Sequence, residues 1–244
     1  MNQRFKFFLC HLSISILIAL IITGIIFFVW YPSPLAQAVG VIHLFIMLIL
    51  IDLIVGPLMT LLIYKKDINA FKMDLSIIII IQIAALIYGL HSITQGRPVW
   101  IVFNQNKFEL VRVNDQFIEN TEHIHKQFQN ISWTGPQYVA AIPSQNIKQR
   151  EDDLFMDALG GVSLAQRPER YVALSHVKQK IQQQSQNLDN LKKFNDIKLV
   201  EKTLNQYPKA TAYLPLKANK LDMVILINKK EGRVVNVVNL RPWE

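Results

Sequence analysis

The sequence contains a single cysteine, Cys10, among its 244 residues. One cysteine excludes an internal disulfide, a cysteine-rich zinc site and an iron–sulfur cluster. Charge is also scarce, because only 18% of the residues are Asp, Glu, Lys or Arg while 51% are hydrophobic. The mean hydropathy of +0.22 is high for a soluble domain. It argues against intrinsic disorder, which requires low hydrophobicity and high charge.

Three long apolar runs near the N-terminus are almost free of charge. Residues 7–30 and 75–93 contain no charged side chain, and residues 35–64 contain only Asp52. Because an α-helix rises ~1.5 Å per residue, ~20 residues are enough to cross a hydrocarbon layer of ~30 Å. We therefore expect residues 1–95 to form a bundle of three transmembrane helices.

The first run is longer than a cleaved signal peptide requires, and the second is longer than a single membrane crossing requires. The first exceeds the ~7–15 apolar residues of a cleaved signal peptide, so we expect it to remain as a membrane anchor. The second exceeds one membrane crossing, which predicts tilt, a kink or a re-entrant end. Pro57, directly after Gly56, is the natural kink because proline removes a backbone donor and clashes with the preceding turn.

The positive charges around these runs predict their orientation. Arg4 and Lys6 precede the first run, and Lys65, Lys66 and Lys72 lie between the second and the third. The loop between the first two runs contains no Lys or Arg. Loops rich in positive charge stay on the cytoplasmic side of a membrane. We therefore expect a cytoplasmic N-terminus, and we expect everything after the third run to be exported.

Residues 96–244 are expected to form one exported domain, because this stretch is long enough for a single packed core. It holds 21 basic and 15 acidic residues, a net charge of +6. For an exported domain, such mild basicity favours lipid headgroups or acidic partners over nucleic acid. Arginines interleaved with aromatic residues, which nucleic-acid platforms use, are missing. The expected partners thus include the lipid bilayer and exclude nucleic acid.

The pattern within this domain is strands, then helices, then strands. Strands are predicted over 99–103, 108–113, 138–142, 223–227 and 234–240. Helices are predicted over 145–159 with Ser144 as its cap, after Ser175, and around 197–204. This order predicts an α+β fold with a mainly antiparallel sheet.

Asp52 is the residue whose position most demands a reason. A carboxylate within a membrane span costs ~3 kcal/mol, so it usually has a function. An intramembrane aspartyl protease needs two aspartates on facing spans, but Asp67 and Asp74 lie outside the apolar runs. We therefore favour a structural or partner-binding role over catalysis. Candidate internal partners of the carboxyl group are polar residues of the same region, namely His43, Thr60 and Gln82.

Other motifs give no support for catalysis. The two histidines of Glu122–His125 alternate as on a strand and could share a metal ion, but no third ligand is near, which favours solvent-facing histidines. Gly161–Ala165 resembles a nucleophile elbow only loosely because it lacks the final glycine. No phosphate-binding glycine loop and no dinucleotide fingerprint occurs. We therefore expect no catalytic residue, no cofactor and no metal, and we expect a protein that is not an enzyme.

Several stretches between residues 11 and 115 resemble those of a known protein family in their order and spacing. They are Trp30–Leu35, Asp52, Gly56–Leu58, Thr60–Leu62, Asp74–Leu75, Gln82, Ala85–Leu86, Tyr88–Gly89, Gly96–Trp100, Val102–Phe103, Phe108, Leu110–Arg112 and Asn114–Asp115. This succession resembles the type IV pilin accessory protein family of the TfpX/TfpZ type. The resemblance thins out toward the C-terminus, where Arg167–Pro168, Tyr171 and Pro242–Trp243 still look similar.

The resemblance implies a multi-pass protein of the bacterial inner membrane with a periplasmic C-terminal domain. Such proteins accompany a particular major type IV pilin and modulate how efficiently it is assembled. No catalytic residues come with the family. The alternative is a membrane-anchored periplasmic sensor or receptor domain that signals through a partner protein. Nothing in the sequence fixes the oligomeric state.

Five residues are candidates for contact with the membrane-resident pilin or for packing of the bundle. They are Asp52, Gly56, Pro57, Thr60 and Arg97. Small and polar positions let another helix approach closely, which favours pilin contact. The competing interpretation is internal: the Gly-Pro pair kinks its own helix, and the arginine anchors the exported domain at the membrane interface.

Overall fold

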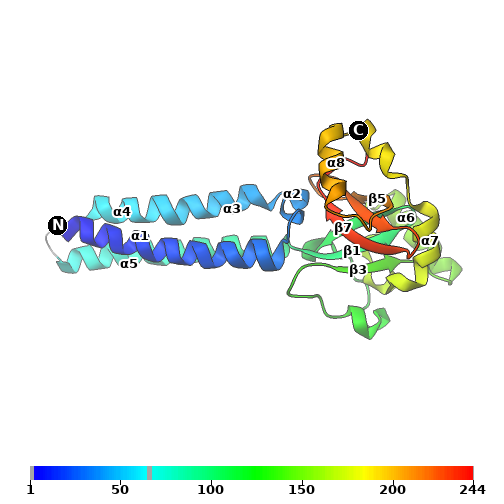
Figure 1. Cartoon of the computed structure of the whole chain (residues 1–244). Helices are drawn as coiled ribbons and strands as arrows, with labels where there is room; N and C mark the ends of the chain where they lie inside the picture. The colour runs from blue at the N-terminus through cyan, green and yellow to red at the C-terminus, as the bar shows by residue number, and fades with distance from the viewer. Residues whose placement is uncertain (1–2, 65–67, 244) are drawn as a thin grey trace. The chain divides into compact units, whose positions relative to one another are not determined.

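The structure is a computed structural model, and it describes residues 3–64 and 68–243. The chain divides into two compact units. One contains the residues up to Pro32 together with Val41–Gly96, and the other contains Ser33–Gly40 together with Arg97–Glu244. The first unit is built from long helices and the second around a sheet (Figure 1).

The helical unit contains the three apolar runs. Its elements are α1 (Gln3–Gly24) with the π-helical η1 (Ile25–Trp30), α3 (Val41–Leu50) with the π-helical η2 (Ile51–Val55), α4 (Gly56–Ile63) and α5 (Ile68–Gln95). Within the described residues, three stretches are long and apolar enough to cross a membrane: Gln3–Trp30, Val41–Ile63 and Asn69–Gln95. These three helices suggest membrane anchoring, as the sequence predicts.

The helix ends differ from the predicted runs. The first and third helices extend beyond residues 7–30 and 75–93, because a helix continues through flanking polar residues as long as its backbone hydrogen bonds are satisfied. The second begins at Val41 instead of residue 35, since Gly40 adopts a left-handed conformation with φ of 84° and ends a separate short helix. Lys65 and Lys66, used above for the orientation, lie outside the described residues.

The helices of this unit pack along their length, with α1 against α4 and α5 against α3 and α4. At one end the rings of Phe7, Tyr64 and Phe71 meet at centroid distances of 5.0–6.2 Å. At the other end the Tyr31 hydroxyl donates to the Ile93 carbonyl oxygen at 2.6 Å. The remaining surface is lined with exposed Leu, Ile, Val and Phe side chains, as expected for helices that face lipid.

The connection between the first two long apolar helices is part of the sheet unit. It contains the short helix α2 (Leu35–Val39), whose Leu35 and Ala38 side chains are buried in the core of the sheet. The Ala38 carbonyl oxygen accepts hydrogen bonds from the amides of Lys220 and Leu221 at 2.9 and 3.1 Å. The exported domain predicted over residues 96–244 thus packs together with eight residues from the N-terminal region.

Seven strands form one mixed sheet within the described residues. They are β1 (Pro98–Asn104), β2 (Lys107–Arg112), β3 (Gln137–Ala141), β4 (Tyr171–Ala173), β5 (Ala212–Lys217), β6 (Met223–Asn228) and β7 (Arg233–Val238). The spatial order is β4-β3-β1-β2-β5-β6-β7. The pairs β1–β3 and β2–β5 are parallel and the other neighbouring pairs are antiparallel.

The prediction of a mainly antiparallel sheet is therefore wrong. The two predicted hairpins, β1–β2 and β6–β7, are present. The parallel pairs arise from two long connections in the chain. The connection from β2 to β3 places β3 beside β1 and parallel to it, and the connection from β4 to β5 places β5 beside β2 and parallel to it. A parallel neighbour requires such a crossover instead of a tight turn.

Both faces of the sheet are covered, because side chains alternate along each strand. On one face Ile101, Leu214 and Ile225 pack with Leu35 of α2 and with Ile181 of α7 (Lys178–Gln184). The opposite face carries two clusters. One of them contains Trp100, Val102 and Tyr171, and the other contains Tyr213, Val224 and Leu191.

Helices and short turns fill the crossovers. Besides α7 they are α6 (Ile147–Ala158), α8 (Ile197–Asn205) and the 3-10 turns η3 (Val113–Asp115), η4 (Thr121–His123), η5 (Lys126–Phe128), η6 (Leu164–Gln166), η7 (Pro168–Arg170), η8 (Leu174–Val177) and η9 (Leu188–Lys193). The α6 cap is Asn146, whose side chain accepts from the Gln149 amide, instead of the predicted Ser144. Ser175 lies within a 3-10 turn and caps no helix.

Candidate functional site

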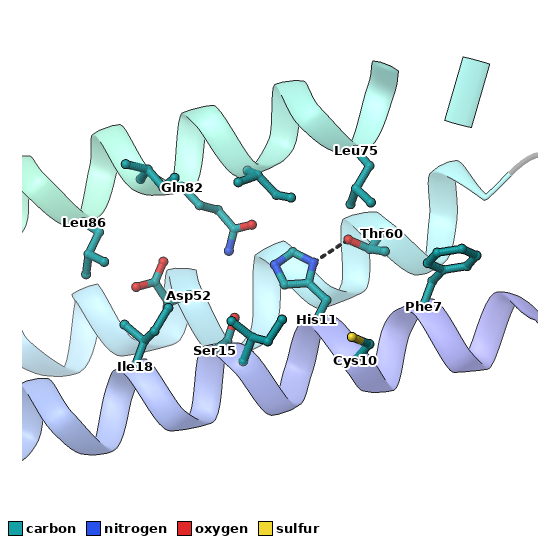
Figure 2. A pocket seen from close by; sticks show the side chains of 13 residues that line it. Phe7, Cys10, His11, Ser15, Ile18, Asp52, Thr60, Leu75, Gln82 and Leu86 are labelled. Atoms are coloured by element: carbon teal, nitrogen blue, oxygen red, sulfur yellow. Dashed lines mark hydrogen bonds between the residues drawn. The ribbon is translucent and has the colours of Figure 1, made fainter. Parts of the chain in front are cut away.

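Polar side chains converge inside the helical unit, at the depth of its apolar runs. His11 and Ser15 come from α1, Asp52 from η2, Thr60 from α4 and Gln82 from α5 (Figure 2). Asp52, Thr60 and Ser15 are 8%, 1% and 7% exposed. Polar groups away from water are stable only when they find partners. Their gathering therefore defines a specific internal site, called the polar cluster below.

Thr60 links two helices of the cluster. Its hydroxyl oxygen lies 2.6 Å from His11 Nδ1 and 3.2 Å from the Gly56 carbonyl oxygen. A hydroxyl has one hydrogen to donate. Both contacts are satisfied when Thr60 donates to the carbonyl oxygen and accepts from a hydrogen on His11 Nδ1. That assignment places a hydrogen on His11 Nδ1.

Asp52 lies in a π-helical segment, one residue after its start. Such wide turns are rare and occur frequently at functional sites. The Asp52 carboxyl group and the Gln82 side chain point toward one another (Figure 2). Gln82 Oε1 is buried and has no hydrogen-bond partner among the described residues. The cluster therefore presents hydrogen-bond acceptors among mainly apolar side chains.

Gly56 makes room for this arrangement. A Cβ at Gly56 would collide with the side-chain amide of Gln82. The missing side chain thus lets α5 approach α4, as small residues do in membrane helices. Pro57 follows at the first turn of α4 and is buried. Because η2 and α4 form one continuous helix over Val41–Ile63, the missing N–H of Pro57 removes a backbone donor inside this helix, next to the wide turns of η2.

A cavity of about 330 Å³ adjoins the polar cluster. Its walls are mainly apolar side chains of α1 and α5, with the five residues of the cluster among them. An apolar cavity with a few convergent polar groups is the usual form of a binding site. Chemically, this cavity can hold an apolar group that brings a hydrogen-bond donor to the Asp52 carboxyl group or to Gln82 Oε1.

The structure brings together Asp52, Gly56 and Thr60, with Pro57 beside them, but it places Arg97 elsewhere. Arg97 precedes β1 in the sheet unit and is 5% exposed. Its guanidinium carbon lies 4.8 Å from the centre of the Trp133 ring, and its Nη1 donates to the Trp133 carbonyl oxygen at 3.4 Å. Arg97 thus contributes to the packing of the domain through a cation–π contact.

Of the three partners considered for Asp52, the structure places only Gln82 beside it. Thr60 bonds His11 instead, and His43 is exposed on α3. His11 and Ser15 are members that the sequence analysis missed. Their spacing of four residues on one helix face within an apolar run is the signal that could have identified them.

The remaining motifs have structural roles in the sheet unit. His123 and His125 are exposed on either side of the buried Ile124. No group of three metal-binding side chains occurs among residues 3–64 and 68–243. Ser163 caps η6 by accepting from the Ala165 amide, and its hydroxyl donates to the buried Glu109 carboxylate at 2.9 Å.

Comparison with known proteins shows that the chain is similar to fimbrial assembly proteins. The family described as "Fimbrial assembly protein FimB" matches residues 1–40. The fimbrial assembly protein of Dichelobacter nodosus serogroup E1 is 29% identical over all of this chain and 99% of its own length. The protein of serogroup I from the same organism is 28% identical over the same shares. No solved structure matches the chain.

A third relative is shorter. The fimbrial assembly protein of Dichelobacter nodosus serogroups C1 and C2 is 35% identical over 124 residues, which are 48% of this chain and 95% of the relative. The other two relatives align with this chain from end to end. The chain therefore belongs to the family of fimbrial assembly proteins described as FimB.

Proposed function

We propose that this protein is a membrane-anchored accessory factor for the assembly of type IV fimbriae, and that it acts by contacting the major pilin while that subunit is still in the membrane. The observation that carries the proposal is the similarity, over the full length of the chain, to proteins named fimbrial assembly proteins. The three membrane-length helices support it. The proposed action is binding and not catalysis.

The proposed location is the bacterial inner membrane, with a cytoplasmic N-terminus and a periplasmic sheet unit. Arg4, Lys6 and Lys72 support this orientation, because they lie in the first turns of α1 and α5, at the helix ends predicted to be cytoplasmic. In this orientation the polar cluster lies within the bilayer, while the sheet unit is exposed to the periplasm. A pilin with one membrane helix and an exported head could then be contacted by both units.

Within the bilayer, the proposed contact is the cavity beside the polar cluster. Side chains of an apolar pilin helix can fill the space between the aliphatic walls, and a donor group among them can bond to Asp52 or Gln82. Hydrogen bonds between membrane helices contribute about 0.6–2 kcal/mol each. One or two such bonds suit a transient contact that releases the subunit for assembly.

The test is a comparison of surface pilin with total cellular pilin. Deleting the gene is expected to change the ratio of sheared surface pilin to total pilin while the total is preserved, and the wild-type gene is expected to restore it. An unchanged ratio, in a strain whose parent demonstrably makes the protein, would refute a role in assembly and would favour the sensor hypothesis.

A further inference from the structure

Trp133 lies in the sheet unit and is 65% exposed. The other two tryptophans of this unit are engaged inside it, because Trp100 is fully buried and Trp243 donates its indole N–H to Asp222. A single exposed aromatic residue is ordinary on a protein surface. The position of Trp133 in the chain and the contacts that hold it are what give its exposure a meaning.

A tight turn presents the indole. The amide of Thr134 donates to Ser132 Oγ at 3.0 Å, and the Ser132 hydroxyl donates to the Thr134 carbonyl oxygen at 3.2 Å. Gly135 follows in a left-handed conformation with φ of 63°, which glycine adopts at little cost. On the other side of the turn, Ile131 packs against one of the core clusters of the sheet. These contacts fix the position of Trp133.

Arg97 clamps the same turn. Its guanidinium carbon lies 4.8 Å from the centre of the Trp133 ring, and its Nη1 donates to the Trp133 carbonyl oxygen at 3.4 Å. Arg97 is only 5% exposed, so this cation–π contact is largely shielded from water. A buried cation thus holds both the ring and the backbone of one exposed residue.

The chain ties Arg97 to the end of the third apolar helix. The uncharged residues 75–93 span about 28 Å as a helix, which matches a hydrocarbon layer of ~30 Å. The helix ends at Gln95, and two further peptide units reach Arg97. The backbone of Arg97 therefore lies within about 10 Å of the hydrocarbon edge. The headgroup layer beyond that edge is about 5–8 Å thick, so Trp133 is held at the membrane surface.

Other aromatic residues mark this level in the helical unit. The Tyr31 hydroxyl donates to the Ile93 carbonyl oxygen at 2.6 Å, which places Tyr31 and the preceding Trp30 at the end of the apolar run. Trp and Tyr gather at membrane–water interfaces because their rings are apolar and their N–H or O–H groups are polar. The two-residue link allows Trp133 to reach the same layer.

The size and charge of this surface favour lipid over a protein partner. The neighbours of Trp133 in the turn, Ser132, Thr134 and Gly135, add no large apolar side chain. One aromatic side chain offers ~150–250 Å², whereas a specific protein interface uses ~800 Å² on each partner. A headgroup layer accepts a single indole, and the net charge of +6 on residues 96–244 suits anionic headgroups.

We propose that Trp133 is an interfacial anchor that inserts its indole among the headgroups of a phospholipid surface and thereby holds the sheet unit at the bilayer. Arg97 is the positioning residue that fixes the turn. The anchor rests on the membrane location proposed above, but it is separate from the contact with the pilin. It assigns a lipid contact to the unit that the sequence places outside the membrane.

The test uses the full-length protein with Cys10→Ala in phospholipid nanodiscs. A nitroxide is attached to one cysteine, introduced as Thr134→Cys, Ile80→Cys or Leu159→Cys. Ile80 is the lipid control because it is 65% exposed on α5, and Leu159 is the water control because it is 75% exposed at the C-cap of α6. Collisions with oxygen, which concentrates in lipid, and with a water-soluble nickel complex are measured. We expect the label at position 134 to meet more oxygen and less nickel than the label at position 159.

Two variants isolate the indole. Trp133→Ala is expected to raise nickel access at position 134 to the level of position 159. Trp133→Tyr is expected to keep the protection, because tyrosine also prefers the interface. The first comparison leaves Trp133 in place, so it does not depend on how well the variants fold.

Three results would overturn the anchor. They are equal nickel access at positions 134 and 159, protection of position 134 from both nickel and oxygen, which indicates cover by protein, and protection that Trp133→Ala leaves unchanged. If position 80 is lipid-exposed in the same experiment, the anchor fails while the proposed membrane location stands. Nickel access at position 80 would refute the membrane location and the anchor together.

Discussion

The two units of this protein differ in which side chains they bury and which they expose. In the helical unit many aliphatic side chains are exposed, and the most specific internal contacts are polar, as between His11 and Thr60. In the sheet unit both faces of the sheet bury apolar side chains. This difference is expected if lipid surrounds the first unit and water the second, because lipid gives no hydrophobic drive between helices while water does. Exposed leucines are therefore expected in the first unit, whereas they are unusual on α6 of the second unit.

Two buried aspartates show the same contrast. Asp153 in the sheet unit is held by two arginines. Asp52 in the helical unit faces the amide of Gln82 and a cavity. The first is a fully paired charge that fixes local structure. The second is an acceptor with space beside it, as expected of a site that receives a partner.

The largest effect is expected from removing the paired aspartate. Asp153→Ala removes the carboxylate that both Arg167 and Arg170 bond, so that buried Arg167 keeps only its pair with Glu119. Breaking a buried ion pair costs about 3–5 kcal/mol. Because these ion pairs anchor α6, the loss is expected to appear first as faster proteolysis within residues 147–158 of the full-length protein. Equal cleavage rates in the variant and the wild type would show that α6 is held by something else.

A second substitution tests where the boundary between the units lies. Leu35 belongs to the connection between two membrane helices, yet it is 3% exposed in the core of the sheet unit. Leu35→Ala is therefore expected to cost about 2–5 kcal/mol. Leu62→Ala, at a position 63% exposed on α4, is expected to change stability by less than about 0.5 kcal/mol. Unfolding of both variants in the same detergent, followed by tryptophan fluorescence, would reveal the difference.

If the two leucines gave equal effects, the assignment of residues 33–40 to the sheet unit would be wrong. A fragment of residues 97–243 offers a further check. It lacks Leu35 and Ala38 and is expected to be less stable than the same fragment joined to residues 33–40 through a flexible linker.

The sheet unit is expected to lose stability in acid through Asp115. Burial raises the pKa of this carboxyl group, but hydrogen bonds from Arg112 at 2.7 and 2.8 Å and the charge of Arg112 outweigh burial and leave the pKa below its usual value. A carboxyl group with a lowered folded pKa contributes stability that is complete above its unfolded pKa of about 3.9 and disappears as the pH falls through the folded pKa.

Asp115→Asn is therefore expected to lower stability at neutral pH and to flatten the acid side of the profile of unfolding midpoint against pH. Asp189→Asn is the control, because Asp189 is 74% exposed in its pair with Lys192 and exposed pairs contribute little. A profile for Asp115→Asn that runs parallel to the wild type down to about pH 3 would contradict the role of Arg112.

The smallest effect concerns the polar cluster. Thr60→Val removes the contacts to His11 and to the Gly56 carbonyl oxygen with little change of shape, and it is expected to cost about 0.6 kcal/mol, the average for such bonds in membrane helices. Unfolding in detergent would measure it. A loss as large as that of Leu35→Ala would show that polar contacts hold the bundle more strongly than packing does.

Local patterns were enough to predict the elements whose signal is local. Apolar runs of membrane length with almost no charge located the three helices, and alternating β-branched runs around a turn located the hairpins β1–β2 and β6–β7. The strand β5 gave no such signal because Pro215 interrupts it, and proline argues against a central strand. Its pairing with β2 involves only Phe108 with Leu216 and Glu109 with Lys217.

Pairings between strands that are far apart in the chain could not be predicted from the sequence, for a physical reason. The parallel neighbours β2 and β5 are about a hundred residues apart in the chain, so no short window contains both. The same holds for Leu35, whose partners on the strands, such as Ile101, lie more than sixty residues away. In the polar cluster Asp52 stood out because charge is costly in a membrane. His11 and Ser15 did not, because single uncharged polar residues are common in spans.

The most direct test of the account is to remove the Asp52 carboxylate in cells. Asp52→Asn and Asp52→Ala, expressed in the deletion strain at the wild-type protein level, are expected to move the ratio of surface to total pilin toward that of the deletion strain. Leu58→Ala, at a position 47% exposed on α4, is expected to leave the ratio unchanged. Normal ratios for both Asp52 variants at normal protein level would contradict the claim that the polar cluster is where the membrane helices act.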